Sequence, residues 1–401
     1  MRKPYTFPFY PVISERKARI AIVGAGPAGA AAGWHLATSG HSVTLIDRAL
    51  FPRDKTCGDW LTPAALSELS RMGLDRAALA RQAPGHASVT TTRLVAPDGR
   101  ESTRTCGIAG ACVPRRALDH LVRERALAAG CEPVERSIRD LAAAASLLAG
   151  FDHVVDARGS TAGAANAIGL RGYWTVRRSA VDAGSAERVE IHTDARYRRG
   201  YAWLFPVHAD AALVRFNLGV GLWKADSNTG HSVSDFLLRF LAQNAVARSV
   251  HAAAFETVRP AGYPVALGLW RNRVADGRVL RIGDAANLAD PLTGDGIGNA
   301  LASGRLVAEA ISAATDAADA AYRWQRQFDM VFIPELRRSL ALRHLLSTTP
   351  AKNLATRFLE RGAPWLGTRL HRAIFGETGY RDCWRDGSET ESQTSRPPKR
   401  S

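Results

Sequence analysis

The sequence predicts an α/β protein that combines a parallel sheet, an antiparallel sheet and a helical C-terminal region. Three observations lead to this class. A short apolar run at 19–23 leads into a glycine-rich loop and an alanine-rich segment, which is the order of a strand–helix–strand crossover. Residues 171–222 alternate between apolar and polar side chains, as strands do. Two stretches, 295–347 and 351–376, are predominantly helical in pattern instead.

The composition is that of a globular protein. Among 401 residues, 46% are hydrophobic and 23% are charged, which excludes a disordered or collagen-like chain. The net charge of +15 is carried mainly by arginine, because lysine occurs at only six positions. The arginines are scattered without a run of five basic residues, so we expect a solvated basic surface and no nucleic-acid partner.

Cysteine usage and hydropathy predict a cytoplasmic protein. The five cysteines show no CxxC spacing, so we expect a reducing compartment, no disulfide framework and no metal site. No stretch of about twenty apolar residues predicts a membrane-spanning helix. Prolines interrupt the N-terminal segment where a secretory signal would be apolar. The basic amphipathic segment around Arg337 and Arg338 leaves contact with a membrane surface open, although we do not expect it.

The first half of the chain predicts alternating strands and helices. Residues 19–23 and 42–47 are expected as strands that flank a helix ending before Gly40. The remaining elements expected in this half are helices at 63–72 and 115–129 and strands at 87–105 and 151–156. Residues before 19 are expected to form a loose arm.

The second half begins with the alternating region and ends in helices. Alternation over 171–222 predicts an antiparallel sheet with one exposed face. The elements expected after it are a helix at 231–249, a strand at 278–282, and helices within 295–347 and 351–376. The polar residues 386–401 are expected to be disordered.

The glycine-rich loop after the first strand predicts a dinucleotide site. Gly24, Gly26 and Gly29 form GxGxxG: the first permits a tight turn, the second lets a pyrophosphate approach the backbone, and the third lets helix and strand pack closely. Asp47 ends the next strand, where its carboxylate can accept hydrogen bonds from ribose hydroxyls. An acid at this position favours FAD or NAD over NADP.

Three later segments favour FAD. The stretches Val113-Pro-Arg115, Val155-Asp156-Ala-Arg-Gly159 and Gly283-Asp284-Ala-Ala resemble blocks shared by flavoprotein monooxygenases and geranylgeranyl reductases. The resemblance implies a glutathione-reductase-like domain that binds FAD noncovalently. The cofactor-binding residues that it implies, besides those of the glycine loop, are Cys57, Gly58, Arg115, Asp284, Pro291, Gly294, Gly296 and Ile297.

Two further segments resemble the geranylgeranyl reductase branch. Residues 52–59, PRDKTCGD, are similar to its cysteine loop, and residues 201–206, YAWLFP, to its aromatic strand. The resemblance implies that Cys57, Tyr201 and Trp203 are catalytic. Tyr201, Trp203 and Phe205 alternate along one strand and are expected to form an apolar wall for substrate.

Two details of the cysteine loop carry further expectations. A lysine and an arginine in the loop are expected to favour the thiolate of Cys57. Asp59 stands where some relatives carry a glycine. The chain therefore differs from the exact prenyl-reductase pattern at this position.

These segments together predict a domain order. We expect an FAD-binding domain at 19–170 and 255–312, with substrate-domain strands near 85–110 inserted in it. A substrate-domain sheet is expected at 171–254, a helical region at 313–385 and a tail at 386–401.

The expected function is an FAD-dependent oxidoreductase that acts on an apolar biosynthetic intermediate, prenyl-like or aromatic. Hydride transfer between flavin N5 and a carbon–carbon bond is the first hypothesis. The alternative is a monooxygenase, or less favourably a halogenase, that uses a C4a-hydroperoxyflavin, because the motifs are common to all these enzymes. No second GxGxxG is present. Electrons are therefore expected from transiently bound NAD(P)H or from a separate donor protein.

Overall fold

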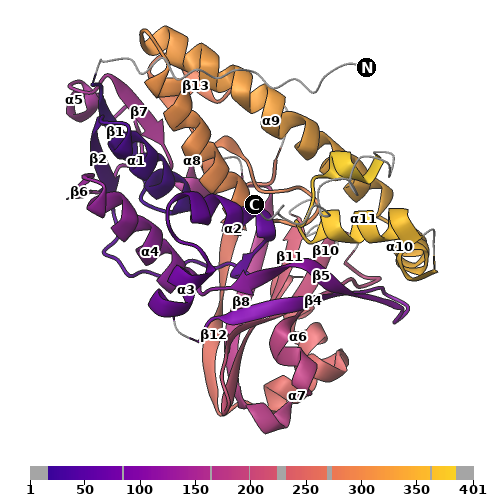
Figure 1. The fold of residues 1–401 in the computed structure, drawn as a ribbon. Helices are drawn as coiled ribbons and strands as arrows, with labels where there is room; N and C mark the ends of the chain where they lie inside the picture. Colours follow the sequence, from indigo (N-terminus) through magenta and orange to yellow (C-terminus); the bar gives the residue numbers. More distant parts are fainter. Residues whose placement is uncertain are drawn as a thin grey trace, which may run out of the picture.

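A computed structural model describes residues 17–83, 85–162, 165–197, 199–223, 232–268, 273–361 and 364–384. The expected disordered tail and nearly all of the expected N-terminal arm lie outside these residues. Two sheets organise the molecule, one of six strands and one of eight (Figure 1). The expected α/β class is confirmed.

The six-stranded sheet is the predicted nucleotide-binding sheet, in the order β13-β14-β7-β1-β2-β6. Its strands are β1 (Arg19–Val23), β2 (Ser42–Asp47), β6 (Glu132–Glu135), β7 (His153–Asp156), β13 (Ala275–Asp276) and β14 (Val279–Arg281). β1 pairs in parallel with β2 and β7, so the predicted crossover is confirmed. The pair β13–β14 is antiparallel and closes one edge.

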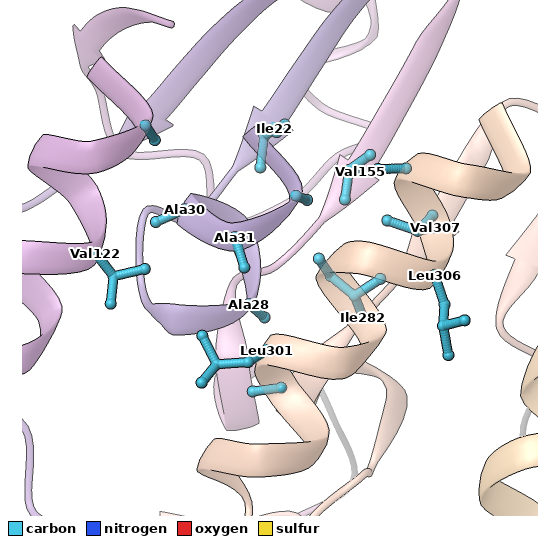
Figure 2. Close-up of a cluster of buried hydrophobic side chains, with 14 of the residues drawn as sticks. Ile22, Ala28, Ala30, Ala31, Val122, Val155, Ile282, Leu301, Leu306 and Val307 are labelled. Carbon is cyan, nitrogen blue, oxygen red and sulfur yellow. The ribbon is translucent and has the colours of Figure 1, made fainter. Parts of the chain in front are cut away.

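Small residues allow two helices to pack closely beside this sheet. Helix α1 (Pro27–Thr38) lies next to α8 (Ile297–Ser312) in the core shown in Figure 2. A Cβ at Gly304 of α8 would lie 2.6 Å from the Ala28 carbonyl oxygen of α1. The middle of α8 therefore packs closely against the first turn of α1.

The second sheet is mixed, in the order β12-β8-β11-β10-β9-β4-β5-β3. Its strands are β3 (Trp60–Leu61), β4 (Ala87–Val95), β5 (Glu101–Cys112), β8 (Ala167–Arg177), β9 (Arg188–His192), β10 (Gly200–Ala209), β11 (Leu213–Trp223) and β12 (Glu256–Val265). All neighbours pair antiparallel except β4 and β9, which are parallel. β12 was not expected as a strand.

The expectation of one exposed face over 171–222 is wrong. β8, β10 and β11 are buried along most of their length. Helices α6 (Val233–Gln243) and α7 (Ala245–Ala253) cover one face, and side chains of the opposite face line a large cavity. The single helix expected at 231–249 is in fact these two, because Asn244 ends α6 and caps α7.

Seven further α-helices lie in the described part of the chain. They are α2 (Pro63–Arg71), α3 (Arg76–Gln82), α4 (Arg115–Ala128), α5 (Ala145–Leu148), α9 (Ala317–Leu345), α10 (Thr349–Arg361) and α11 (Pro364–Ile374). In Figure 1 the long α9 runs along one side of the molecule toward α10 and α11. Within the described part of the chain, no helix is both long and apolar enough to cross a bilayer.

Candidate functional site

One cavity of about 890 Å³ connects the predicted motifs. Its walls come from the carboxyl ends of β1 and β2, from the loop at 53–58, from β10 and β11, and from the loop before α8. Side chains of α10 and α11 line its other end. Segments far apart in sequence therefore face a single space, as expected for ligands that bind beyond the carboxyl ends of parallel strands.

The glycine loop has the geometry that its sequence predicts. Gly24 has φ +109°, and a Cβ there would lie 2.2 Å from the Ala157 carbonyl oxygen. A Cβ at Gly29 would lie 1.8 Å from the Gly24 oxygen. No side chain caps the start of α1, so the N–H groups that follow Pro27 in its first turn are available to an anion at the cavity wall.

Asp47 lies at the cavity, at the end of β2. Its carboxylate accepts the backbone N–H of Ala25 at 2.7 Å and that of Ala49 at 2.9 Å. These bonds hold the carboxylate against the glycine loop, where ribose hydroxyls could reach its remaining lone pairs.

Arg115 begins α4 and is held by a buried carboxylate. Asp119, one turn later, accepts two hydrogen bonds from the Arg115 guanidinium at 2.6 and 2.8 Å. Arg53 bonds to the same carboxylate at 2.8 Å. The pairing fixes the Arg115 side chain, which lines the cavity near Cys57.

The loop before α8 forms another part of the cavity wall. Asp284 pairs with Lys55 at 2.9 Å, which joins this loop to the cysteine loop. The other predicted residues of this segment that line the cavity are Pro291, Gly294, Gly296 and Ile297. α8 starts at Ile297, so its amino end is directed at the cavity wall.

The aromatic strand forms the predicted wall. Tyr201, Trp203 and Phe205 of β10 line the cavity, with ring centroids 5.9 Å apart for the first pair and 6.2 Å for the second. The Tyr201 hydroxyl donates to the Thr293 carbonyl oxygen. β10 therefore contacts the loop before α8 at Tyr201.

The prediction that Cys57 is a thiolate is wrong. Burial raises the pKa of the Cys57 thiol, and this outweighs the lowering influence of the Arg115 guanidinium. Lys55, expected to favour the thiolate, is engaged by Asp284 instead. Cys57 lines the cavity as a neutral thiol at neutral pH.

Four polar residues behind the wall were missed as site residues by the sequence analysis. Asp59 accepts hydrogen bonds from the Tyr173 hydroxyl at 2.6 Å and the Asn217 amide at 2.8 Å. Arg171 donates to Asp54 and to the carbonyl oxygen of Cys57. A signal was available, because Arg171 and Asn217 interrupt apolar strands, and buried polar groups need partners.

The far end of the cavity is largely apolar. Aliphatic side chains there include Leu346, Leu359, Leu370 and Ile374, from the end of α9 and from α10 and α11. Two cationic side chains, Arg343 and Lys352, also line this end. The helical C-terminal region therefore shapes the space beyond the aromatic wall.

The residues present fit FAD. The glycine loop offers backbone donors at a close approach, Asp47 lies beside it, and the cavity continues past Asp284 to a second helix start. An FAD binding domain model matches residues 17–178.

Comparisons with known proteins agree. The chain is 30% identical over 342 residues to the menaquinone reductase of Mycobacterium tuberculosis, covering 77% of this chain and 79% of the relative. It is 27% identical over 357 residues to digeranylgeranylglycerophospholipid reductase 2 of Methanopyrus kandleri, covering 80% and 85%.

Solved structures share the fold. A geranylgeranyl bacteriochlorophyll reductase-like protein from Thermoplasma acidophilum superposes with a TM-score of 0.68 at 18% identity, covering 86% of this chain and 91% of that one. The flavin-dependent brominase Bmp2 gives 0.68 at 17% identity, covering 92% and 96%.

Fold, site and comparisons define an FAD-dependent oxidoreductase, which confirms the expected cofactor and enzyme class. The chain belongs to the family of FAD-dependent oxidoreductases that includes the menaquinone reductase of Mycobacterium tuberculosis, and relatives named geranylgeranyl diphosphate reductase and digeranylgeranylglycerophospholipid reductase match it as well, in line with its motifs.

Proposed function

We propose that the chain is a reductase that saturates a carbon–carbon double bond in an apolar, prenyl-like chain. The observation that carries the proposal is the continuation of the cavity past the aromatic wall of β10 to the aliphatic side chains of α10 and α11. An extended apolar substrate would replace water along this path. Relatives named menaquinone reductase and digeranylgeranylglycerophospholipid reductase support the choice of substrate class.

The proposed FAD-binding residues divide between the two ends of the cofactor. Gly24, Gly26, Gly29 and Asp47 would hold the pyrophosphate and the adenosine ribose noncovalently. Those proposed to surround the rest of the cofactor are Cys57, Gly58, Arg115, Asp284, Pro291, Gly294, Gly296 and Ile297. FAD held by these residues would supply hydride chemistry at the cavity.

We assign the proton of the reaction to Cys57. Saturating an alkene needs one hydride, which bound reduced FAD would supply as its two-electron donor, and one proton. Cys57 lines the cavity as a thiol, which can donate its proton to the second carbon. Arg115 would then stabilise the thiolate until the thiol is reprotonated. Tyr201, Trp203 and Phe205 would hold the chain against this side of the cavity.

The electron source belongs to the same proposal. No separate nicotinamide-binding motif is present in the sequence, so NAD(P)H would bind transiently or a donor protein would reduce the flavin. Stopped-flow reduction of the holoprotein by NADH, NADPH or reduced ferredoxin identifies the donor.

The experiment that tests the function is a single turnover under two atmospheres. Anaerobically reduced holoprotein is mixed with a geranylgeranyl lipid or with menaquinone in detergent, and the flavin absorbance and product mass are followed. The proposal expects reoxidation without oxygen and a product that gains two hydrogen atoms in its prenyl chain, located by fragment masses after any quinol has been reoxidised in air. A product that forms only in air and gains an oxygen atom would establish the monooxygenase instead. A Cys57→Ser variant should retain flavin and lose most of the anaerobic turnover.

A further inference from the structure

Asp59 has a backbone conformation that favours glycine. It is fully buried and has φ +63°, in the left-handed region that non-glycine residues seldom occupy. Glycine would fit this backbone without strain, so the contacts of the Asp59 side chain must explain why an aspartate is here.

The Asp59 carboxylate receives three hydrogen bonds from three separate elements. One oxygen accepts the Arg115 backbone N–H at 3.2 Å, at the start of α4. The other accepts the Tyr173 hydroxyl of β8 and the Asn217 amide of β11. All three partners are donors, which matches the acceptor-only character of a carboxylate.

Asp59 also serves as the missing cap of α4. Pro114 is the residue before this helix and its side chain makes no capping bond. The bond from Arg115 N–H to Asp59 supplies an acceptor from outside the helix. The first residue of α4 is therefore held by Asp59, and the same residue carries the guanidinium beside Cys57.

Asn217 extends the contact to the substrate side of the cavity. Its amide donates to Asp59 at 2.8 Å and to the Cys57 carbonyl oxygen at 2.6 Å. Its oxygen accepts the Trp203 indole N–H at 2.8 Å. Because Asp59 and Cys57 both accept from the amide nitrogen, the amide oxygen is left facing Trp203.

We propose that Asp59 is a positioning residue that sets Cys57, Arg115 and Trp203 relative to one another. Asp59 does not itself line the cavity, whereas all three of these residues do. It acts on Cys57 through its own N–H, 3.4 Å from the sulfur, and on Trp203 through Asn217. The proposal rests on the proposed function only for its activity measurement.

Two variants separate the anchoring of Asn217 by Asp59 from the negative charge of the Asp59 carboxylate. Asp59→Gly suits the positive φ and removes the carboxylate, whereas Asp59→Asn suits the same backbone and keeps one acceptor oxygen for Tyr173 and Asn217. Hydrogen exchange of the Trp203 indole N–H, assigned by its loss in Trp203→Phe, is followed by NMR in FAD-saturated protein. Anaerobic turnover of the same samples is measured alongside.

The two variants are expected to differ in the exchange of the Trp203 indole N–H. Asp59→Gly should speed indole exchange and slow turnover by about tenfold or more, since each lost hydrogen bond is worth roughly that factor. Asp59→Asn keeps the acceptor for Asn217 but turns an amide NH2 toward the Arg115 N–H, so its indole exchange should stay within about threefold of the parent while its turnover falls by up to about tenfold. Unchanged exchange in Asp59→Gly would overturn the proposal. Accelerated indole exchange in Asp59→Asn would overturn it too, because this variant keeps the acceptor oxygen for Asn217 and the lost charge would then be the cause.

A second variant keeps the test decisive if Asp59→Gly does not fold. Asn217→Leu preserves size but removes both bonds from Asn217 to the Asp59 and Cys57 side. Alkylation of Cys57 by iodoacetamide should then accelerate by about tenfold, because the loop loses its anchor. An unchanged rate would count against the proposal. Exchange and alkylation need no turnover, so failure of the reductase function leaves both readable.

Discussion

The edge of the Phe205 ring lies where a side chain on Gly58 would be. A Cβ at Gly58 would come within 2.9 Å of Phe205 Cε2 and 3.6 Å of the Trp203 indole nitrogen. The cysteine loop therefore lies directly against the aromatic wall of β10, and there is no room between them for another methyl group.

Gly58→Ala should impair turnover more than FAD binding. The new methyl must displace Phe205 or the loop, which costs about 1–3 kcal/mol in a packed site. We expect a lower free energy of unfolding by urea and a reduced turnover number with FAD retained. Gly262→Ala is the control, because its Cβ would make ordinary contacts of 3.7 Å or more and Gly262 is exposed. Equal effects of the two substitutions would contradict the prediction.

Asp284→Ala should weaken FAD binding by about tenfold or more, as expected for the loss of a hydrogen bond to a charged group. The substitution also frees Lys55, which pairs with Asp284 at 2.9 Å. Gly26→Val should have a similar effect, because its side chain would occupy the cavity wall beside Arg53. Isothermal titration of the apoprotein with FAD measures both. Asp276→Ala, at the exposed residue of β13, should bind like the parent. Asp284→Ala that binds FAD with the Kd of the parent would refute the assignment.

Stability should fall as the pH rises through about 6 because of Asp59. Burial raises the pKa of the Asp59 carboxyl to about 6, although Arg171 and the bonds from Tyr173 and Asn217 act to lower it. The unfolded value is about 3.9, so the folded state binds the proton more tightly. The resulting stabilisation is complete below pH ~4 and is lost as the pH passes the folded pKa, by on the order of 3 kcal/mol.

The measurement is urea unfolding of the parent and of Asp59→Asn at pH 5 and pH 8. The parent should gain stability relative to the variant at the lower pH. A difference that does not change with pH would show that Asp59 does not titrate in this range.

Cys57 should react slowly with alkylating agents at pH 8. Burial raises the pKa of its thiol above the ordinary value, so a smaller fraction is thiolate at that pH than in free cysteine. We expect site-resolved mass spectrometry of the holoprotein to give a rate below that of free cysteine, because the thiol is protonated and only partly exposed. A rate close to that of free cysteine would restore the thiolate hypothesis.

Trp203→Ala should keep FAD but weaken substrate binding. Trp203 stacks with Phe205 within the aromatic wall and donates a hydrogen bond to Asn217. It is not among the proposed cofactor residues. Truncation of a large aromatic residue costs about 3–5 kcal/mol of stability. Trp203→Phe is therefore measured with it, because it removes only the indole and its hydrogen bond. A rise in KM with unchanged flavin content is expected in both, and loss of flavin in Trp203→Phe would assign the residue to the cofactor site.

The sequence by itself determined the nucleotide-binding crossover, the FAD assignment and the aromatic alternation on β10. These depend on neighbouring residues: a turn that needs glycine, a strand of period two, and motifs that lie within a few positions. The domain boundaries and site roles stay predictions. β12, within the range expected for the FAD domain, pairs with β8 in the other sheet.

Only the tertiary structure decided the state of Cys57 and the role of Asp59. The partners of Asp59 lie 114 and 158 positions away, at Tyr173 and Asn217, and no local pattern pairs them. Lys55 lies two positions before Cys57 in sequence but is paired with Asp284, 229 positions later. The charge state of a side chain depends on its burial and on every charge that folding brings near, so sequence neighbours alone do not determine it.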